Sequence, residues 1–209
     1  MMDPLFRDRG VTLLELLIAL TLGVVVILGV LAVWRETQLA YLDGAEAAEA
    51  QQSLRVAMER VVEVVRNAGA NPTGIPNFSA FGQAGEECLR VFADLQGDGD
   101  RSPPDGDLND PWEDVRFEYR DGVFRQQNGA GSSQSLAFGI VPNSGNLPIF
   151  QYLDDAGVLI PPGGRCAMAP ENLRRISRVI VTLTAQGAVP GETVARTLRS
   201  EVRPRNVPY

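Results

Sequence analysis

Glu15 is the residue of this sequence with the clearest chemical demand, because it is the only charge between Gly10 and Arg35. A carboxylate well inside a bilayer costs roughly 2.5–3.5 kcal/mol on insertion scales, so such a residue is a candidate for function. The alternative is that Glu15, one turn from the start of a helix, reaches the lipid headgroups and gains from the helix dipole. That alternative explains why the carboxylate is tolerated, but not the glycine directly before the apolar run.

A second candidate site is an acidic stretch at residues 94–114, which holds eight acids and one arginine. Its first twelve residues fit the twelve-residue calcium-loop pattern at positions one, five, six and twelve. Gly99 would supply the sharp turn. The predicted oxygen ligands are the side chains of Asp94, Gln96, Asp98 and Asp105 and the carbonyl of Asp100.

The acidic stretch also departs from that pattern. Gln96 replaces Asp or Asn at position three, Asp105 replaces Glu at position twelve, and Pro103-Pro104 prevents an ordinary exiting helix. Three residues that follow, Asp107, Asn109 and Asp110, could substitute as ligands. A solvated acidic turn is the alternative, since Asp and Gly are common in surface turns. Repulsion among eight acids favours a cation, and the sequence therefore predicts calcium as a cofactor.

Catalytic machinery of the common kinds cannot be assembled from this composition. The chain has no His, and all 19 of its basic residues are Arg. This excludes a metal site built on His, a Cys/His pair and a Ser-His-Asp triad. No P-loop or dinucleotide-binding fingerprint occurs. We predict that the protein is not an enzyme, and the net charge of −7 argues against bulk attachment to nucleic acid.

The apolar run that contains Glu15 is long enough to anchor the chain in a membrane. Residues 11–33 would form about 35 Å of helix, against a hydrocarbon core of about 30 Å. A secretory signal has a shorter apolar core and a small-residue cleavage site, which Val33-Trp34-Arg35 does not provide. Arg7 and Arg9 before the span predict a cytoplasmic N-terminus, with the C-terminal bulk of the chain on the other side of the membrane.

The helix is expected to continue beyond the membrane. Strong helix formers run without Gly or Pro from Ala45 to Ala68. Within them, apolar residues recur with a helical period suited to packing on a sheet: Leu54, Ala57, Met58, Val61, Val64, Val65 and Ala68. We therefore expect a transmembrane part at 11–34 and an amphipathic periplasmic part at 35–70. Two helices broken at Asp43-Gly44 are the alternative.

Residues 71–209 are expected to form one β-rich domain, because the apolar period changes to two. Asp121-Gly122 lies between two of the candidate strands and predicts a hairpin turn. The candidate strands are 88–93, 115–119, 123–127, 135–140, 149–153, 177–185 and 194–203. A long helix followed by an antiparallel sheet is an α+β arrangement.

Cys88 and Cys166 are the only cysteines of the chain. In an oxidising periplasm two cysteines of one domain pair more often than not, so we predict a disulfide. Two buried free thiols are the alternative, because spacing alone does not show that their Cα atoms approach within bonding range.

The N-terminus resembles the type IV prepilin class. The segment R-G-V-T-L-L-E-L-L-I-A-L differs from the commonest form mainly at Val11, where Phe is usual. The resemblance implies that residues 1–10 are a leader, that a prepilin peptidase cuts between Gly10 and Val11, and that Val11 is then N-methylated. Glu15 becomes the fifth residue of the mature chain. It would pair with the α-amine of a neighbour's Val11, because a buried carboxylate without a partner is strongly penalised.

Three soluble segments, 66–69, 94–100 and 202–206, extend the resemblance to PilW-type minor pilins and their pilin architecture. Such subunits help to initiate or cap a type IV pilus. The implied partners are other major and minor pilins, the inner-membrane assembly platform, and membrane lipid before assembly. The J-type minor pseudopilin of type II secretion is the alternative, since it shares the architecture and the N-terminal motif. A membrane-tethered periplasmic binding protein is an alternative of another class.

Overall fold

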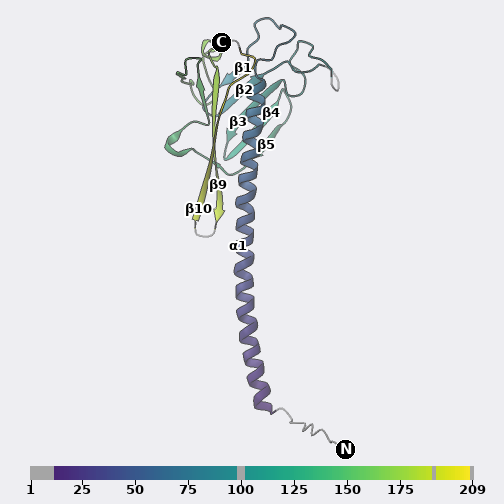
Figure 1. Ribbon diagram of the computed structural model, residues 1–209, viewed down its shortest axis with the longest axis vertical. Coiled ribbons are helices and arrows are strands. Elements are labelled where there is room, and N and C mark those ends of the chain that lie inside the picture. The colour runs from purple at the N-terminus through teal and green to yellow at the C-terminus, as the bar shows by residue number, and fades with distance from the viewer. Residues whose placement is uncertain (1–11, 98–101, 190–191, 208–209) are drawn as a thin grey trace, which may run out of the picture. The chain divides into compact units, whose positions relative to one another are not determined.

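The computed structural model describes residues 12–97, 102–189 and 192–207. The chain forms two compact units, Met1–Ala45 and Glu46–Tyr209, which we describe in turn. The fold is α+β: a long N-terminal helix with an apolar first part, followed by a domain of antiparallel sheets (Figure 1).

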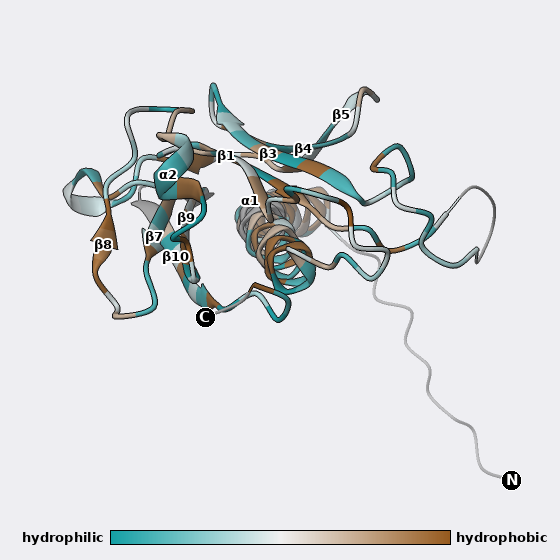
Figure 2. Cartoon of the chain, turned by 90° about the horizontal axis from the view of Figure 1, so that it is seen from above, coloured by the Kyte–Doolittle hydropathy of each residue, from teal (hydrophilic) through white to brown (hydrophobic). Residues whose placement is uncertain are grey.

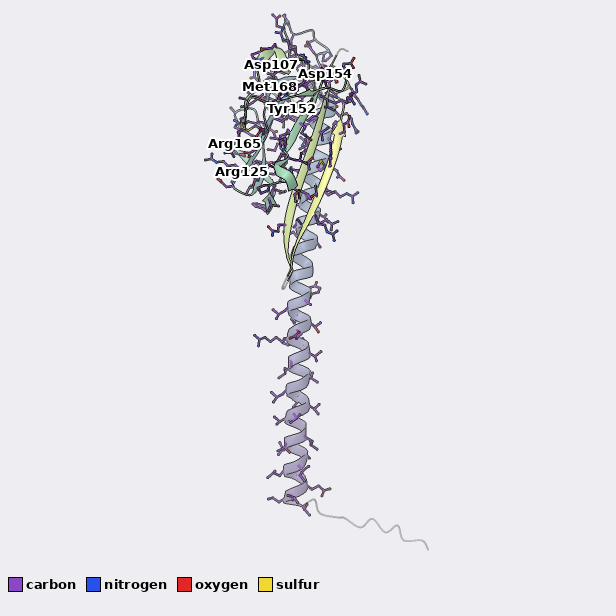
Figure 3. The ribbon with its side chains drawn as sticks, turned by 90° about the vertical axis from the view of Figure 1, so that its left-hand side faces the viewer. Asp107, Arg125, Tyr152, Asp154, Arg165 and Met168 are labelled. Carbon is purple, nitrogen blue, oxygen red and sulfur yellow. A yellow bond between two sulfur atoms is a disulfide. The ribbon has the colours of Figure 1, made fainter. Side chains whose placement is uncertain are left out.

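The first unit consists, in its described part, of the beginning of helix α1 (Leu13–Asn67). The stretch Leu13–Tyr41 is long and apolar enough to cross a membrane, and no other described helix meets that test. Its large apolar side chains are all exposed, from 49% for Ile18 to 84% for Leu13. Figure 3 shows these side chains projecting outward around the helix.

The second unit is built around the last turns of α1. The predicted apolar stripe, from Leu54 to Ala68, is buried in full and belongs to the one core of this unit. This part of α1 lies between two sheets, as the view from above shows (Figure 2). This burial confirms the predicted stripe. A helix covered on both sides needs more than one apolar row, and positions 57, 58, 61, 64 and 65 provide the additional row.

The first sheet has five antiparallel strands in sequence order. Its strands are β1 (Phe81–Ala84), β2 (Cys88–Phe92), β3 (Asp114–Arg120), β4 (Val123–Asn128) and β5 (Ser133–Ala137). The predicted turn at Asp121-Gly122 joins β3 to β4, and both residues have positive φ, at 51° and 77°. The long loop between β2 and β3 carries the acidic stretch.

The second sheet has the order β10-β9-β7-β8, with β6 paired to β9. Its strands are β6 (Ile140–Val141), β7 (Phe150–Leu153), β8 (Leu159–Ile160), β9 (Arg178–Val189) and β10 (Glu192–Val202). A short 3-10 turn (Ser144–Asn146) and helix α2 (Pro170–Leu173) lie in its connections. The long hairpin β9–β10 pairs in continuous register from Val179↔Val202 to Val189↔Glu192.

The predicted strands are found, with three differences. The expected strand 135–140 is divided, since β5 ends at Ala137 and β6 begins at Ile140 in the other sheet. Gly139, at φ 66°, makes the bend between them. Strand β1, in which Gly82 interrupts the pattern, and the two-residue β8 were not predicted. Helix is assigned to every residue from Leu13 to Asn67, including Asp43-Gly44, where a break was the alternative.

Candidate functional site

Glu15 lies in the first turn of α1, where Thr12 precedes the helix. The backbone N–H of Glu15 donates to Thr12 Oγ1 at 3.3 Å, and the N–H of Leu16 donates to the Thr12 carbonyl at 3.2 Å. Thr12 therefore caps the helix and satisfies a backbone donor that has no partner within the helix. The side chain of Glu15 is exposed among apolar side chains that are exposed as well.

Gly10 and Val11, the predicted processing junction, lie outside the described residues. Of the predicted N-terminal site, the structure describes Glu15. The capping role of Thr12 was missed by the sequence analysis, although the spacing Thr-x-x-Glu is a signal for it.

The acidic loop begins and ends on two wholly buried carboxylates, Asp94 and Glu113, which are 1% and 0% exposed. Thr73 Oγ1 donates a short hydrogen bond to Asp94 Oδ2. Glu113 Oε1 accepts the backbone N–H groups of Leu95 and Gln96, at 2.7 and 2.9 Å. Glu113 therefore fastens the start of the loop to its end, a role that the sequence analysis missed because no local pattern marks it.

The other oxygens of these two carboxylates, Asp94 Oδ1 and Glu113 Oε2, are buried and accept no hydrogen bond from a described residue. Burial raises the pKa of Glu113, although its hydrogen bonds from Gln96 and Leu95 lower it, and the carboxylates of Asp110 and Asp94 raise it further. Glu113 thus lies close enough to Asp110 and to Asp94 to be repelled by each of them.

Three further carboxylates of the loop come together. One oxygen each of Asp105, Asp107 and Asp110 lies within 4.8 Å of the others. The turn that carries them is shaped by Gly106, whose φ of 92° is in the left-handed region. A Cβ at Gly106 would lie 3.3 Å from Thr73 Oγ1, so the turn lies beside the residue that hydrogen-bonds to Asp94.

The predicted calcium ligands are only partly brought together. Gln96 Nε2 donates to the carbonyl of Pro111 at 3.0 Å, and Asp105 belongs to the cluster with Asp107 and Asp110. Asp98 and Asp100 lie outside the described residues. Asp114, the last acid of the stretch, is paired with Arg90 through two contacts of 2.8 and 2.6 Å.

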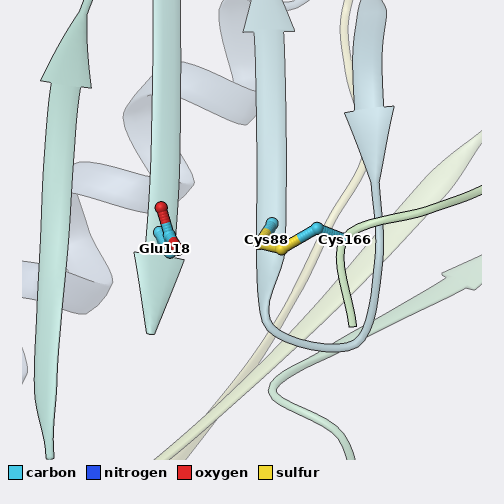
Figure 4. Close-up of side chains that lie close together, drawn as sticks. All are labelled: Cys88, Glu118 and Cys166. Carbon is cyan, nitrogen blue, oxygen red and sulfur yellow. A yellow bond between two sulfur atoms is a disulfide. The ribbon is translucent and has the colours of Figure 1, made fainter. Parts of the chain in front are cut away.

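Cys88 and Cys166 form a disulfide, with their Cα atoms 4.9 Å apart (Figure 4). Glu118 on β3 is the cross-strand partner of Cys88. The Cys166 segment is held beside β1 and β2 by backbone groups as well, since Glu87 N–H donates to the Arg165 carbonyl at 2.9 Å. Gln83 Nε2 donates to the Cys166 carbonyl at 2.6 Å.

Residues 5–31 match a family model described as the prokaryotic N-terminal methylation motif, the prepilin signal of type IV pilin-like proteins. The match covers Gly10, Val11, Thr12 and Glu15. No curated protein and no solved structure matches the chain. The motif and the apolar helix fit a protein of the pilin or pseudopilin kind that is anchored in the inner membrane and carries a C-terminal globular domain.

Proposed function

We propose that this chain is a minor pilin, which helps to initiate, cap or assemble a type IV pilus. A prepilin peptidase cuts it between Gly10 and Val11 and Val11 is methylated. Residues 13–41 anchor the mature chain in the inner membrane before assembly, and the chain then packs into the filament through its N-terminal helix. Its partners are major and minor pilins and the inner-membrane assembly platform.

The observation that carries this proposal is the exposed apolar surface of α1 with one carboxylate at its start. The large apolar side chains from Leu13 to Trp34 are exposed by about half or more. Such a surface needs lipid or other helices around it. A helix that leaves lipid for a bundle of like helices exchanges one apolar environment for another, so packing contacts and charge pairing must decide its register.

Processing is the first test of the proposal. We expect the mature protein to begin at N-methylated Val11, as intact mass and N-terminal peptide analysis would measure. Gly10→Leu should block the cut and leave the full precursor in the membrane. Gly23→Ala is the matched control, since a Cβ at Gly23 meets nothing within 4 Å and the position lies within the helix. A wild-type chain that keeps residues 1–10 would favour a membrane-tethered binding protein and contradict the proposal.

Deletion of the gene then separates the two kinds of filament. Loss of surface pili with normal protein secretion is expected for a minor pilin. Normal piliation with secreted proteins retained in the periplasm would contradict that assignment and make the chain a minor pseudopilin of type II secretion.

A further inference from the structure

We propose that the loop between β2 and β3 binds one calcium ion through Asp105, Asp107 and Asp110, over a floor formed by the buried carboxylates of Asp94 and Glu113. The ligand set differs from the twelve-residue pattern of 94–105, because it comes mainly from the second half of the loop. The proposal does not depend on the function of the filament.

The geometry of the three loop carboxylates suits a single ion. Calcium binds oxygens at about 2.3–2.6 Å, so two ligands of one ion are at most about 5 Å apart. Oxygens of Asp105, Asp107 and Asp110 already lie within 4.8 Å of one another. The donors are all oxygen, which hard cations such as calcium prefer. Magnesium, at about 2.0–2.1 Å, demands a tighter octahedron and keeps its waters, so it fits this spacing less well.

The second observation is independent of that cluster and concerns the buried floor. Asp94 and Glu113 are almost completely buried, and each keeps one oxygen that accepts no hydrogen bond from the described residues. Neither carboxylate forms an ion pair with an arginine in the described part of the chain, whereas the neighbouring Asp114 is paired with Arg90. A buried carboxylate without a counter-charge is costly, and a bound cation would offset that cost.

The floor and the cluster belong to one place in the loop. Thr73 donates to Asp94, and its Oγ1 would lie 3.3 Å from a Cβ at Gly106, which lies between Asp105 and Asp107. Glu113 N–H donates to the Asp110 carbonyl at 3.4 Å. A Cβ at Gly97 would lie 3.1 Å from Asp105 Oδ2, so the two sides of the loop pack against each other there. The start of the loop, the turn at Gly106 and the end of the loop thus pack together in one region.

The frame around the loop is held without the ion. Glu113 Oε1 holds the backbone of Leu95 and Gln96, and Trp112 stacks under the guanidinium of Arg60 on α1, 4.1 Å from ring centroid to Cζ. The ion would therefore enter a largely formed site. Calcium would neutralise the repulsion among the carboxylates and stabilise the loop as part of the folded domain.

The test measures calcium binding by the full mature chain in detergent. Isothermal titration should give one ion per chain, with a Kd in the range of about 0.1–1 mM that is usual for extracellular calcium modules. Thermal unfolding should shift upward in calcium relative to chelator, and much less in magnesium. Asp107→Asn should weaken calcium binding by about tenfold or more, because a ligand loses its charge. Asp121→Asn is the matched control: Asp121 is exposed in the β3–β4 turn at φ 51°, which Asn tolerates, and this variant should bind as wild type does.

Two more variants test which half of the loop supplies the ligands and whether an arginine, rather than calcium, is the counter-charge. Asp98→Asn should weaken binding less than Asp107→Asn; the reverse order would place the ion in the first half of the loop and overturn our assignment. Arg101→Gln should leave calcium binding intact or tighten it. A chain that ignores calcium at several millimolar, and that loses stability on Arg101→Gln, would show that an arginine is the counter-charge and that there is no metal site.

Discussion

Glu15 has two explanations at the scale of single residues, and they make different demands on its side chain. Thr12 and Glu15 have the spacing of a capping box, in which the carboxylate returns to the backbone N–H of the capping residue. The other explanation is the proposed charge pair with the α-amine of Val11 on a neighbouring subunit. A capping box accepts Gln in place of Glu, but a charge pair does not.

This difference gives a direct prediction for filament assembly. Glu15→Gln keeps a capping partner and removes the charge, so we expect it to be inserted and cleaved normally but to enter pili at least about tenfold less. We expect the same defect for Glu15→Ala. Glu36→Gln, which removes the next acid along α1, is the control and should assemble normally. The measurement is the amount of subunit in sheared pilus fractions, by immunoblot. If Glu15→Gln assembles like wild type while Glu15→Ala does not, Glu15 acts in helix capping and not in charge pairing.

At the scale of elements, the predictions succeeded where the signal was local. The period of 3.6 from Leu54 to Ala68 identified the buried face of α1, and the β-branched run Val179-Ile180-Val181-Thr182 identified β9. They failed where a distant contact decides the structure. A Cβ at Gly82 would lie 2.4 Å from the ring of Phe92, so Gly82 is required by packing inside β1 and yet breaks the strand pattern.

The acidic loop shows the same limit. The linear ligand pattern predicts a calcium site within residues 94–105. In the structure, Asp105, Asp107 and Asp110 lie close together because of the turn at Gly106. The floor of the loop depends on Glu113, which folds back onto Leu95 and Gln96 from 17 or 18 residues away in the chain. Periodicity and spacing rules describe residues a few positions apart, so they do not predict contacts between residues 17 or 18 positions apart.

The two sheets of the domain are joined by a tyrosine on β7. Tyr152 is 0% exposed; its hydroxyl donates to the Gly85 carbonyl at 2.8 Å and accepts the Gly85 N–H at 3.1 Å, in the turn between β1 and β2. We predict that Tyr152→Phe lowers the free energy of unfolding by about 1–3 kcal/mol, since a buried carbonyl loses its donor. Urea unfolding of the mature chain in detergent, followed by tryptophan fluorescence, would measure this.

The control for that prediction is Tyr119→Phe, because the Tyr119 hydroxyl is 3.4 Å from its acceptor and the residue is only half-buried.

The free energy of unfolding at alkaline pH gives a second test of Tyr152. Burial raises the pKa of Tyr152 well above its usual value of 10.0, and the hydrogen bond with Gly85 opposes this. The folded state therefore keeps the proton longer than the unfolded chain, so stability should fall as the pH rises above 10. Tyr152→Phe should reduce this alkaline loss. An unchanged pH profile in this variant would contradict the raised pKa of the buried Tyr152 hydroxyl.

At the scale of the whole molecule, the globular unit is closed by a covalent link between segments far apart in sequence. The Cys88–Cys166 disulfide spans 78 residues and ties the start of β2 to the segment between β8 and α2. That segment approaches so closely that a Cβ at Gly85 would lie 2.3 Å from the Arg165 carbonyl. An ion pair between Arg165 and Glu87 and the backbone bond from Glu87 to Arg165 hold it in the same place.

Removal of the disulfide should destabilise the domain mainly because the unfolded chain gains conformational freedom. Lost contacts should matter less, because the backbone hydrogen bonds around Arg165 remain. For a loop of this length the chain-entropy model gives an upper figure of about 4–5 kcal/mol. We predict that Cys88→Ala/Cys166→Ala, and wild type in reductant, lose a similar amount of about 2–5 kcal/mol in urea unfolding. Reductant should not affect the double variant, which is the control.

Non-reducing peptide mapping of periplasmic material should recover the two cysteines in one linked pair. Alkylation of both thiols without prior reduction would contradict the prediction and leave the globular unit dependent on its apolar core.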